Sequence, residues 1–112
     1  MIVDGIVTAD KNPKYGANPG NDTTDKIFLL SITEAEKYFS SNSKRVCKPT
    51  AYAEANGVYI SNDSSCWWWL RSPGVLPNSA ADVADGGSIY YVGNYANDVN
   101  ICVRPAMWIS IE

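Results

Sequence analysis

The stretch Cys66–Leu70, with the sequence CWWWL, contains three of the chain's four tryptophans at consecutive positions. Successive side chains point to opposite faces of a β-strand, and on a helix they lie about 100° apart. No regular element can therefore turn all three rings toward one face. If residues 66–70 form a strand, Trp67 and Trp69 share one face and Trp68 takes the other. We expect a central strand covered on both faces, with at least two of these rings in the core, because each buried ring removes about 150–250 Å² from water.

The size and composition of the chain indicate one globular domain. A length of 112 residues fits a single domain, 1–112, that can build one hydrophobic core. Hydrophobic residues make up 46% and charged residues 19%, which is typical of a folded protein. The nine basic residues form no stripe, so we expect no nucleic-acid partner. Apolar runs reach only about five residues, far short of a membrane span, so we expect no membrane insertion by this domain.

The first half of the chain has loop and helix signals. Residues 9–26 are rich in Asn, Gly, Pro and Asp, so we expect an irregular lead-in over residues 1–22. A buried strand is expected at 27–30, and a capping box, Ser31/Glu34 or Thr33/Glu36, predicts a short helix over 34–39 that ends in a polar loop at 40–43. A second short helix is expected over 50–57, with Gly57 as its left-handed C-cap.

The second half is typical of β-structure. Residues 58–60 are strand-like, 66–70 should form a strand, and 101–111 are again apolar and β-rich. Between them, turn signals alternate with short runs such as 88–92. Helices followed by strands predict an α+β domain, with two short helices, a small antiparallel sheet and long loops.

The reactive side chains do not indicate an enzyme. The chain has no histidine, the commonest general base, and no motif that would activate a serine or cysteine nucleophile. The three cysteines, Cys47, Cys66 and Cys102, are either three small buried hydrophobes or one disulfide and a free thiol. Asn21-Asp22 and Asn62-Asp63 are interpreted as solvated turns rather than calcium ligands. We therefore expect no catalytic residues, no metal site and no cofactor.

Four motifs carry a resemblance: TTDKIFLLS at 23–31, CKPTAYAEANG at 47–57, CWWWLRSPG at 66–74 and VRPAMWI at 103–109. Together they resemble an uncharacterised domain family of gut-dwelling Firmicutes. That family in turn looks like the C-type lectin fold, in the branch shared by formylglycine-generating enzymes and the variable proteins of diversity-generating retroelements. The resemblance implies a fixed centre built from the tryptophan strand and the closing RPAMW strand, and long loops that display a binding surface.

The segment Ser72–Cys102 fits the retroelement branch. Its 31 residues contain no Lys, Glu, Gln, Met or Trp, and no Arg. Such retroelements randomise adenines, chiefly in AAC or AAT codons, and the resulting NNC and NNT codons cannot encode the first five of these residues. The alternative interpretation is an ordinary polar, turn-rich β segment. The segment is nevertheless rich in Tyr, Asn and Asp, and Tyr with Asn is the composition of antibody-like recognition surfaces.

The resemblance and the composition predict a ligand-binding module, a variable protein whose ligand is a protein, such as a cell-surface or phage receptor. The alternative is a structural or glycan-binding appended domain of a bacterial cell-surface protein. The sequence does not fix the compartment; the cell surface, or association with a phage as part of a longer protein, fits this prediction. The expected ligand-binding residues are Asn78, Asp82, Asp85, Tyr90, Tyr91, Asn94, Tyr95, Asn97, Asp98 and Asn100.

Other residues are expected to stabilise the fold beneath that surface. Trp67, Trp69 and Trp108 should be core residues on the strands. Arg71 and Arg104 should bind loop carbonyls or a carboxylate such as Asp25. Leu70 and Pro105 complete the residues that we expect to stabilise the fold.

Overall fold

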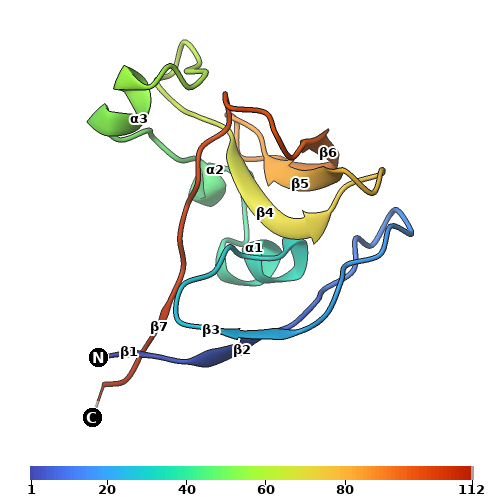
Figure 1. Cartoon of the computed structure of the whole chain (residues 1–112). Coiled ribbons are helices and arrows are strands. Elements are labelled where there is room, and N and C mark those ends of the chain that lie inside the picture. Colours follow the sequence, from blue (N-terminus) through green and yellow to red (C-terminus); the bar gives the residue numbers. More distant parts are fainter. Residues whose placement is uncertain (112) are drawn as a thin grey trace.

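The centre of the molecule is an antiparallel three-stranded sheet in the order β4-β5-β6 (Figure 1). The computed structural model describes residues 1–111. The strands are β4 (Trp68–Pro73), β5 (Ser79–Val83) and β6 (Ile89–Tyr95). A C-terminal segment runs along the other edge of β4, where Cys102 accepts a hydrogen bond from the Trp69 N–H and donates one to the Trp67 carbonyl. The tryptophan strand is thus the edge strand of this sheet and β5 the middle one, so the expected central position is wrong; the C-terminal segment meets β4 only at the bridge Trp68–Cys102.

Two small antiparallel pairs lie at the periphery. Strand β1 (Ile2–Val3) pairs with β7 (Trp108–Ile109), and β2 (Gly5–Val7) pairs with β3 (Thr23–Asp25). The first pair brings the two ends of the chain together (Figure 1). The expected irregular lead-in is therefore right for residues 8–22 and wrong for the two strands before them. Those strands gave no signal because two or three residues carry too little pattern.

Three short helices follow the first strands: α1 (Ile32–Tyr38), α2 (Asn42–Arg45) and α3 (Ala51–Ala55). The capping box of α1 is the predicted one, since Ser31 Oγ accepts from the Glu34 N–H and Glu34 accepts from the Ser31 N–H. Helix α3 begins after Thr50, and Gly57 has the expected left-handed backbone at φ +83°. Both predicted helices are confirmed, while α2 was expected to be loop.

Helix α2 depends on contacts that are distant in sequence. Its N-cap, Ser41, makes no capping hydrogen bond. Its last residue, Arg45, is buried and donates to the carbonyls of Gly87 and Phe39 and to the side chain of Asn42. A single turn this short is unstable alone, so its helical form follows from the docking of Arg45.

The core lies between β4, β5 and α1. Trp68, Leu70 and Val83 meet Ile32 and Ala35 of α1, and all are at most 1% exposed. Figure 1 places α1 on one face of β4. Only this face of the strand is fully covered, and it is the Trp68 face.

The expected core role of Trp67, Trp69 and Trp108 is therefore wrong. Trp67 and Trp69 are half-buried on the opposite face, and Trp108 is 47% exposed. The expectation that at least two rings of the CWWWL run lie in the core also fails, because Trp68 is the one buried ring of the three. The side chains of the tryptophan run alternate between the two faces, as expected for a strand. This alternation does not determine which of the two faces the helices cover.

The two expected strands outside the sheet form isolated bridges or hydrogen bonds and no strand. Within 27–30, Phe28 forms one bridge with Ala106, and within 58–60 the Tyr59 N–H donates to the Asn100 carbonyl. The closing stretch 101–111 is strand only at β7. No helix among residues 1–111 is long and apolar enough to cross a membrane.

Arg71 and Arg104 are internal, with partners other than Asp25. Arg71 donates to the carbonyls of Thr8 and Leu29 and forms ion pairs with Asp10 and Glu34. The guanidinium of Arg104 lies over the rings of Phe39 and Trp68, 4.7 and 4.8 Å from their centroids. Arg71 is thus an internal strut as expected, whereas Arg104 packs on aromatic rings and its Nη1 is buried without a hydrogen-bond partner among residues 1–111, so the expected bonds of Arg104 to carbonyls or a carboxylate are wrong.

We predict that Trp68→Ala lowers the free energy of unfolding by about 3–5 kcal/mol, because a fully buried ring is replaced by a cavity. The matched variant Trp108→Ala should cost clearly less, since nearly half of that side chain is exposed. Urea unfolding of both variants measures the difference. Equal losses would contradict this assignment of the core.

Candidate ligand-binding site

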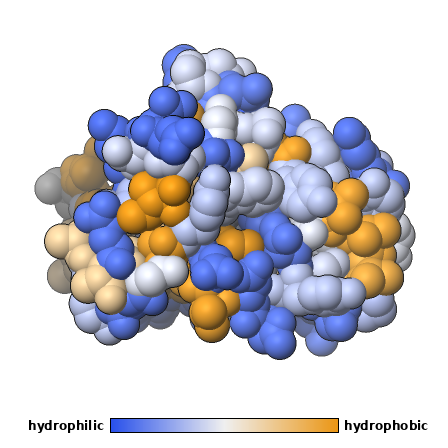
Figure 2. Space-filling model, turned by 90° about the horizontal axis from the view of Figure 1, so that it is seen from above, coloured by the Kyte–Doolittle hydropathy of each residue, from blue (hydrophilic) through white to orange (hydrophobic). Residues whose placement is uncertain are grey.

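The ten expected ligand-binding residues follow the chain from the β4–β5 turn to the loop after β6. Five have exposed side chains and three are half-buried near the surface. The exposed ones are Asn78, Tyr90, Tyr95, Asn97 and Asn100, and the half-buried ones are Asp85, Asn94 and Asp98. Seen from the side away from α1, the hydrophobic residues form separate patches among hydrophilic ones (Figure 2).

Two of the ten residues do not belong to an exposed surface. Asp82 is completely buried. Tyr91 is half-buried and packs against the core, with the Lys14 ammonium 4.1 Å from its ring centroid. Tyr90 and Tyr91 are successive residues of β6, so their side chains point to opposite faces. The expectation that all ten share one exposed surface is therefore wrong at these two positions.

Three expected residues gather in a hollow of about 230 Å³. Asn94 comes from β6, and Asp98 and Asn100 come from the loop that follows. The Asn100 N–H donates to Asp98 Oδ1 at 2.9 Å, which fixes the loop. The other lining residues are Tyr59, Trp67 and Ile101.

Sequence reasoning missed the aromatic side of this hollow. Trp67 was assigned to the core, yet its ring meets Tyr90 edge-on, with 5.5 Å between centroids. Tyr59 reaches the hollow because its N–H donates to the Asn100 carbonyl, 41 positions later in the chain. The available signal was the alternation of the tryptophan run, which puts Trp67 on the face opposite Trp68.

Asp82 lies beneath the lining of this hollow. In the register of the sheet it is opposite Trp69 on β4 and Tyr90 on β6, so these three side chains share the open face. A register shift in β6 places Asn94 near it, and Asn94 Nδ2 donates to Asp82 Oδ2 at 2.6 Å. Gly93 permits the shift. Its backbone has φ +76°, and a Cβ at this position would lie 2.1 Å from the Ala80 carbonyl oxygen.

The Asp82 carboxyl has an unusual environment. Burial raises its pKa to about 6, the Asn94 hydrogen bond acts in the opposite direction, and the nearby Asp98 carboxylate adds to the rise. Its second oxygen, Oδ1, is buried and has no hydrogen-bond partner among residues 1–111. A buried polar atom of this kind normally has a partner.

A second hollow, of about 470 Å³, is lined by three of the exposed candidates, while the exposed Tyr90 lines neither hollow. The lining residues of the second hollow are Asn78, Tyr95, Ala96 and Asn97. The Ala96 N–H donates to the Asn78 carbonyl, which joins the β4–β5 turn to the loop after β6. Asp85 lies in the β5–β6 turn, outside both hollows.

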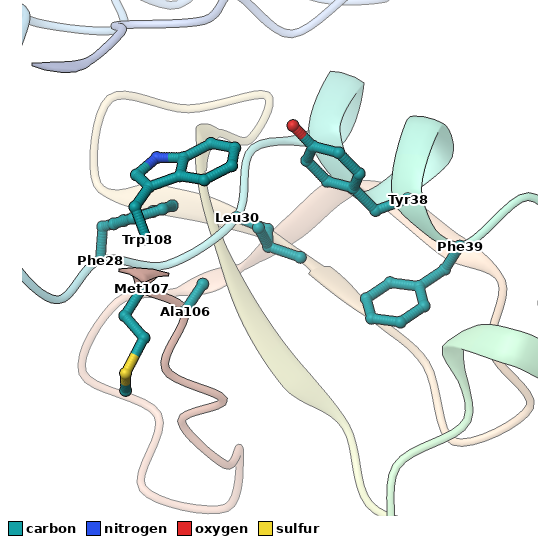
Figure 3. Close-up of a pocket in the computed structure, with 7 residues that line it drawn as sticks. All are labelled: Phe28, Leu30, Tyr38, Phe39, Ala106, Met107 and Trp108. Carbon is teal, nitrogen blue, oxygen red and sulfur yellow. The ribbon is translucent and has the colours of Figure 1, made fainter. Parts of the chain in front are cut away.

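An apolar cavity of about 300 Å³ lies on the α1 side of the molecule (Figure 3). Figure 3 shows the rings of Trp108 and Tyr38 on either side of Leu30. Trp108 packs against Tyr38 and Phe28, with 6.4 Å between centroids in each pair. The sequence did not predict this cavity, because Trp108 was placed in the core.

The three cysteines line a cleft of about 460 Å³ between α3 and the segment 101–105. All are free thiols; Cys66 and Cys102 are buried and Cys47 is half-buried. Burial raises the pKa of the Cys66 thiol, and its neighbours Cys102 and Cys47 raise it further. Cys66 is therefore protonated at neutral pH, and a thiol is a weak nucleophile. Among residues 1–111 there is no group of three or more cysteine or acidic side chains placed to hold a metal ion.

The family described as a domain of unknown function (DUF6273) matches residues 1–111, so the chain belongs to this family. No curated protein and no solved structure matches the chain.

We predict that Asp82 makes folding stability depend on pH. A carboxyl whose pKa is raised on folding stabilises the fold below the unfolded pKa of about 3.9, and this contribution is lost as the pH rises through about 6. The isosteric variant Asp82→Asn lacks this titration. The stability of the wild type relative to the variant should fall by about 2 kcal/mol between pH 4 and pH 8. Urea unfolding at both pH values tests this, and a constant difference would contradict it.

Proposed function

We propose that this member of the DUF6273 family is a ligand-binding module whose ligand is a protein. The observation that carries the proposal is the gathering of exposed Tyr and Asn side chains around two hollows. Such residues supply stiff contact area and adaptable hydrogen bonds, which suit protein recognition. The backbone beneath them is held by a sheet with a fully buried core, so the side chains can vary without disturbing the fold.

We further propose a C-type lectin-like arrangement and a relation to the variable proteins of diversity-generating retroelements. Support comes from the α+β architecture with a central antiparallel sheet, and from the absence of Lys, Glu, Gln, Met and Trp between Ser72 and Cys102. The exposed candidates lie within this segment, while the three tryptophans of the CWWWL run lie outside it. The alternative function remains an appended domain of a cell-surface protein that is structural or binds glycans.

The genome that encodes the chain tests the retroelement relation. We expect a reverse-transcriptase gene and a second, near-identical copy of the codons for Gly74–Trp108 that differs almost only at adenines. Sequencing of the surrounding locus decides the matter. Differences spread over all four bases, or no second copy, would favour the appended-domain alternative.

We predict that the exposed positions tolerate change. Alanine at Asn78, Tyr95, Asn97 and Asn100 together should leave the fold intact, because exposed substitutions usually change stability by at most about 0.5 kcal/mol each. A matched variant with alanine at Asp82, Tyr91 and Asn94, which pack or hydrogen-bond beneath the surface, should lose much more. Thermal unfolding compares the two. Collapse of the first variant would show that the segment is part of the core.

A further inference from the structure

The hollow at Trp67 is surrounded by hydrogen-bond acceptors and by negative charge. Asp98 contributes a carboxylate to its lining, and the buried carboxyl of Asp82 is hydrogen-bonded to Asn94, which lines the same hollow. Among residues 1–111 the ion pairs are those of Arg71 with Asp10 and Glu34, so neither Asp82 nor Asp98 is paired. The whole segment 72–102 contains no Lys or Arg that could neutralise them.

Asp82 also sets the orientation of Asn94. An ionised carboxylate only accepts hydrogen bonds, so the amide nitrogen of Asn94 must face Asp82, as observed at 2.6 Å. The Asn94 carbonyl oxygen is then turned away from Asp82. Asn94 lines the hollow, so an amide whose nitrogen is held by Asp82 leaves its oxygen as the group that can accept from a ligand.

The aromatic lining completes the chemistry. Trp67 and Tyr59 both line the hollow, and Tyr90 supports the Trp67 ring from the side. Indole and phenol rings attract cations that lie over their faces, with tryptophan the strongest. A hollow that combines such rings with a carboxylate and amide oxygens matches a positively charged group better than a neutral or anionic one.

We propose that this hollow binds a cationic side chain of the partner protein, the guanidinium of an arginine or the ammonium of a lysine. This inference rests on the proposed function and names the chemistry of one contact within it. Asp98 and the Trp67 ring contact the cation, and Asp82 is a positioning residue that acts through Asn94. The buried, unpartnered Oδ1 of Asp82 adds negative potential beneath the site.

Three capped tripeptides test the proposal: acetyl-Gly-Arg-Gly-amide, acetyl-Gly-Lys-Gly-amide and the citrulline analogue, which has the shape of arginine without its charge. Titration is followed by NMR at the Trp67 indole N–H and the Asn94 side-chain amide. We expect the arginine or lysine peptide to bind about tenfold more tightly than the citrulline peptide. The preference between arginine and lysine distinguishes a guanidinium from an ammonium site.

Two variants control the experiment. Asp98→Asn keeps the acceptor for the Asn100 N–H and removes the charge, and it should weaken the cationic peptide about tenfold. Asp4→Asn removes the same charge at an exposed position outside the hollow and should have little effect. Equal binding of all three peptides would overturn the cation inference and leave a binding hollow in place, so the proposed function would stand. Binding of none at tens of millimolar, or an Asp98→Asn variant that binds as the wild type does, would also overturn the inference. The proposed function would then be tested by the alanine variants at the exposed positions and by the search for a second genomic copy of the codons for Gly74–Trp108.

Discussion

The burial of Trp68 is the constraint on which the rest of the structure depends. Its ring is completely enclosed, its indole N–H donates to the Arg45 carbonyl at 2.9 Å, and Phe39 and Arg104 pack against its faces and edge. These contacts fix which face of β4 is covered. Because strand neighbours alternate, they also force Trp67 and Trp69 onto the open face. The aromatic part of the candidate site is therefore a consequence of the core. The same run of residues places Trp68 in the core on one side of the strand and Trp67 in the lining of the hollow on the other.

The sequence predicted what depends on local chemistry. The capping box at Ser31 and the left-handed Gly57 are both present, because each needs only its neighbours within a few residues. The choice of the covered face of β4 was not predictable in this way, since the alternation of the tryptophans is compatible with either face. The burial of Asp82 depends on a register shift in β6 and a hydrogen bond to a residue 12 positions away. The short pair β1–β7 joins residues more than 100 positions apart, which no local pattern reveals.

The positions of the arginines explain why the hollow is acidic. Arg71 is occupied by two carboxylates and two carbonyls, and Arg45 is buried on the carbonyls that close α2. Arg104 lies over rings that belong to the core. All three arginines thus stabilise either the packed side of the sheet or the edges of that side. The segment 72–102, which supplies much of the open face, contains acids and no bases, so its negative charge is not balanced within the segment.

A buried aspartate at position 82 costs stability when it is ionised, because its charge is removed from water and only one of its oxygens has a partner. Its effect on the surface is specific, however. While the carboxyl is ionised, it accepts from Asn94 Nδ2 and holds the amide carbonyl on the side away from Asp82. Once the carboxyl is protonated, it can donate as well as accept, and the amide is free to reverse. The protonation state of the buried Asp82 carboxyl thereby determines whether Asn94 offers its amide oxygen as an acceptor or its amide nitrogen as a donor. Because the pKa of this group is about 6, the acceptor form prevails at neutral pH. In the cation site that we propose, the buried charge acts through Asn94, and this is a reason for an acid to occupy a position where its charge costs stability.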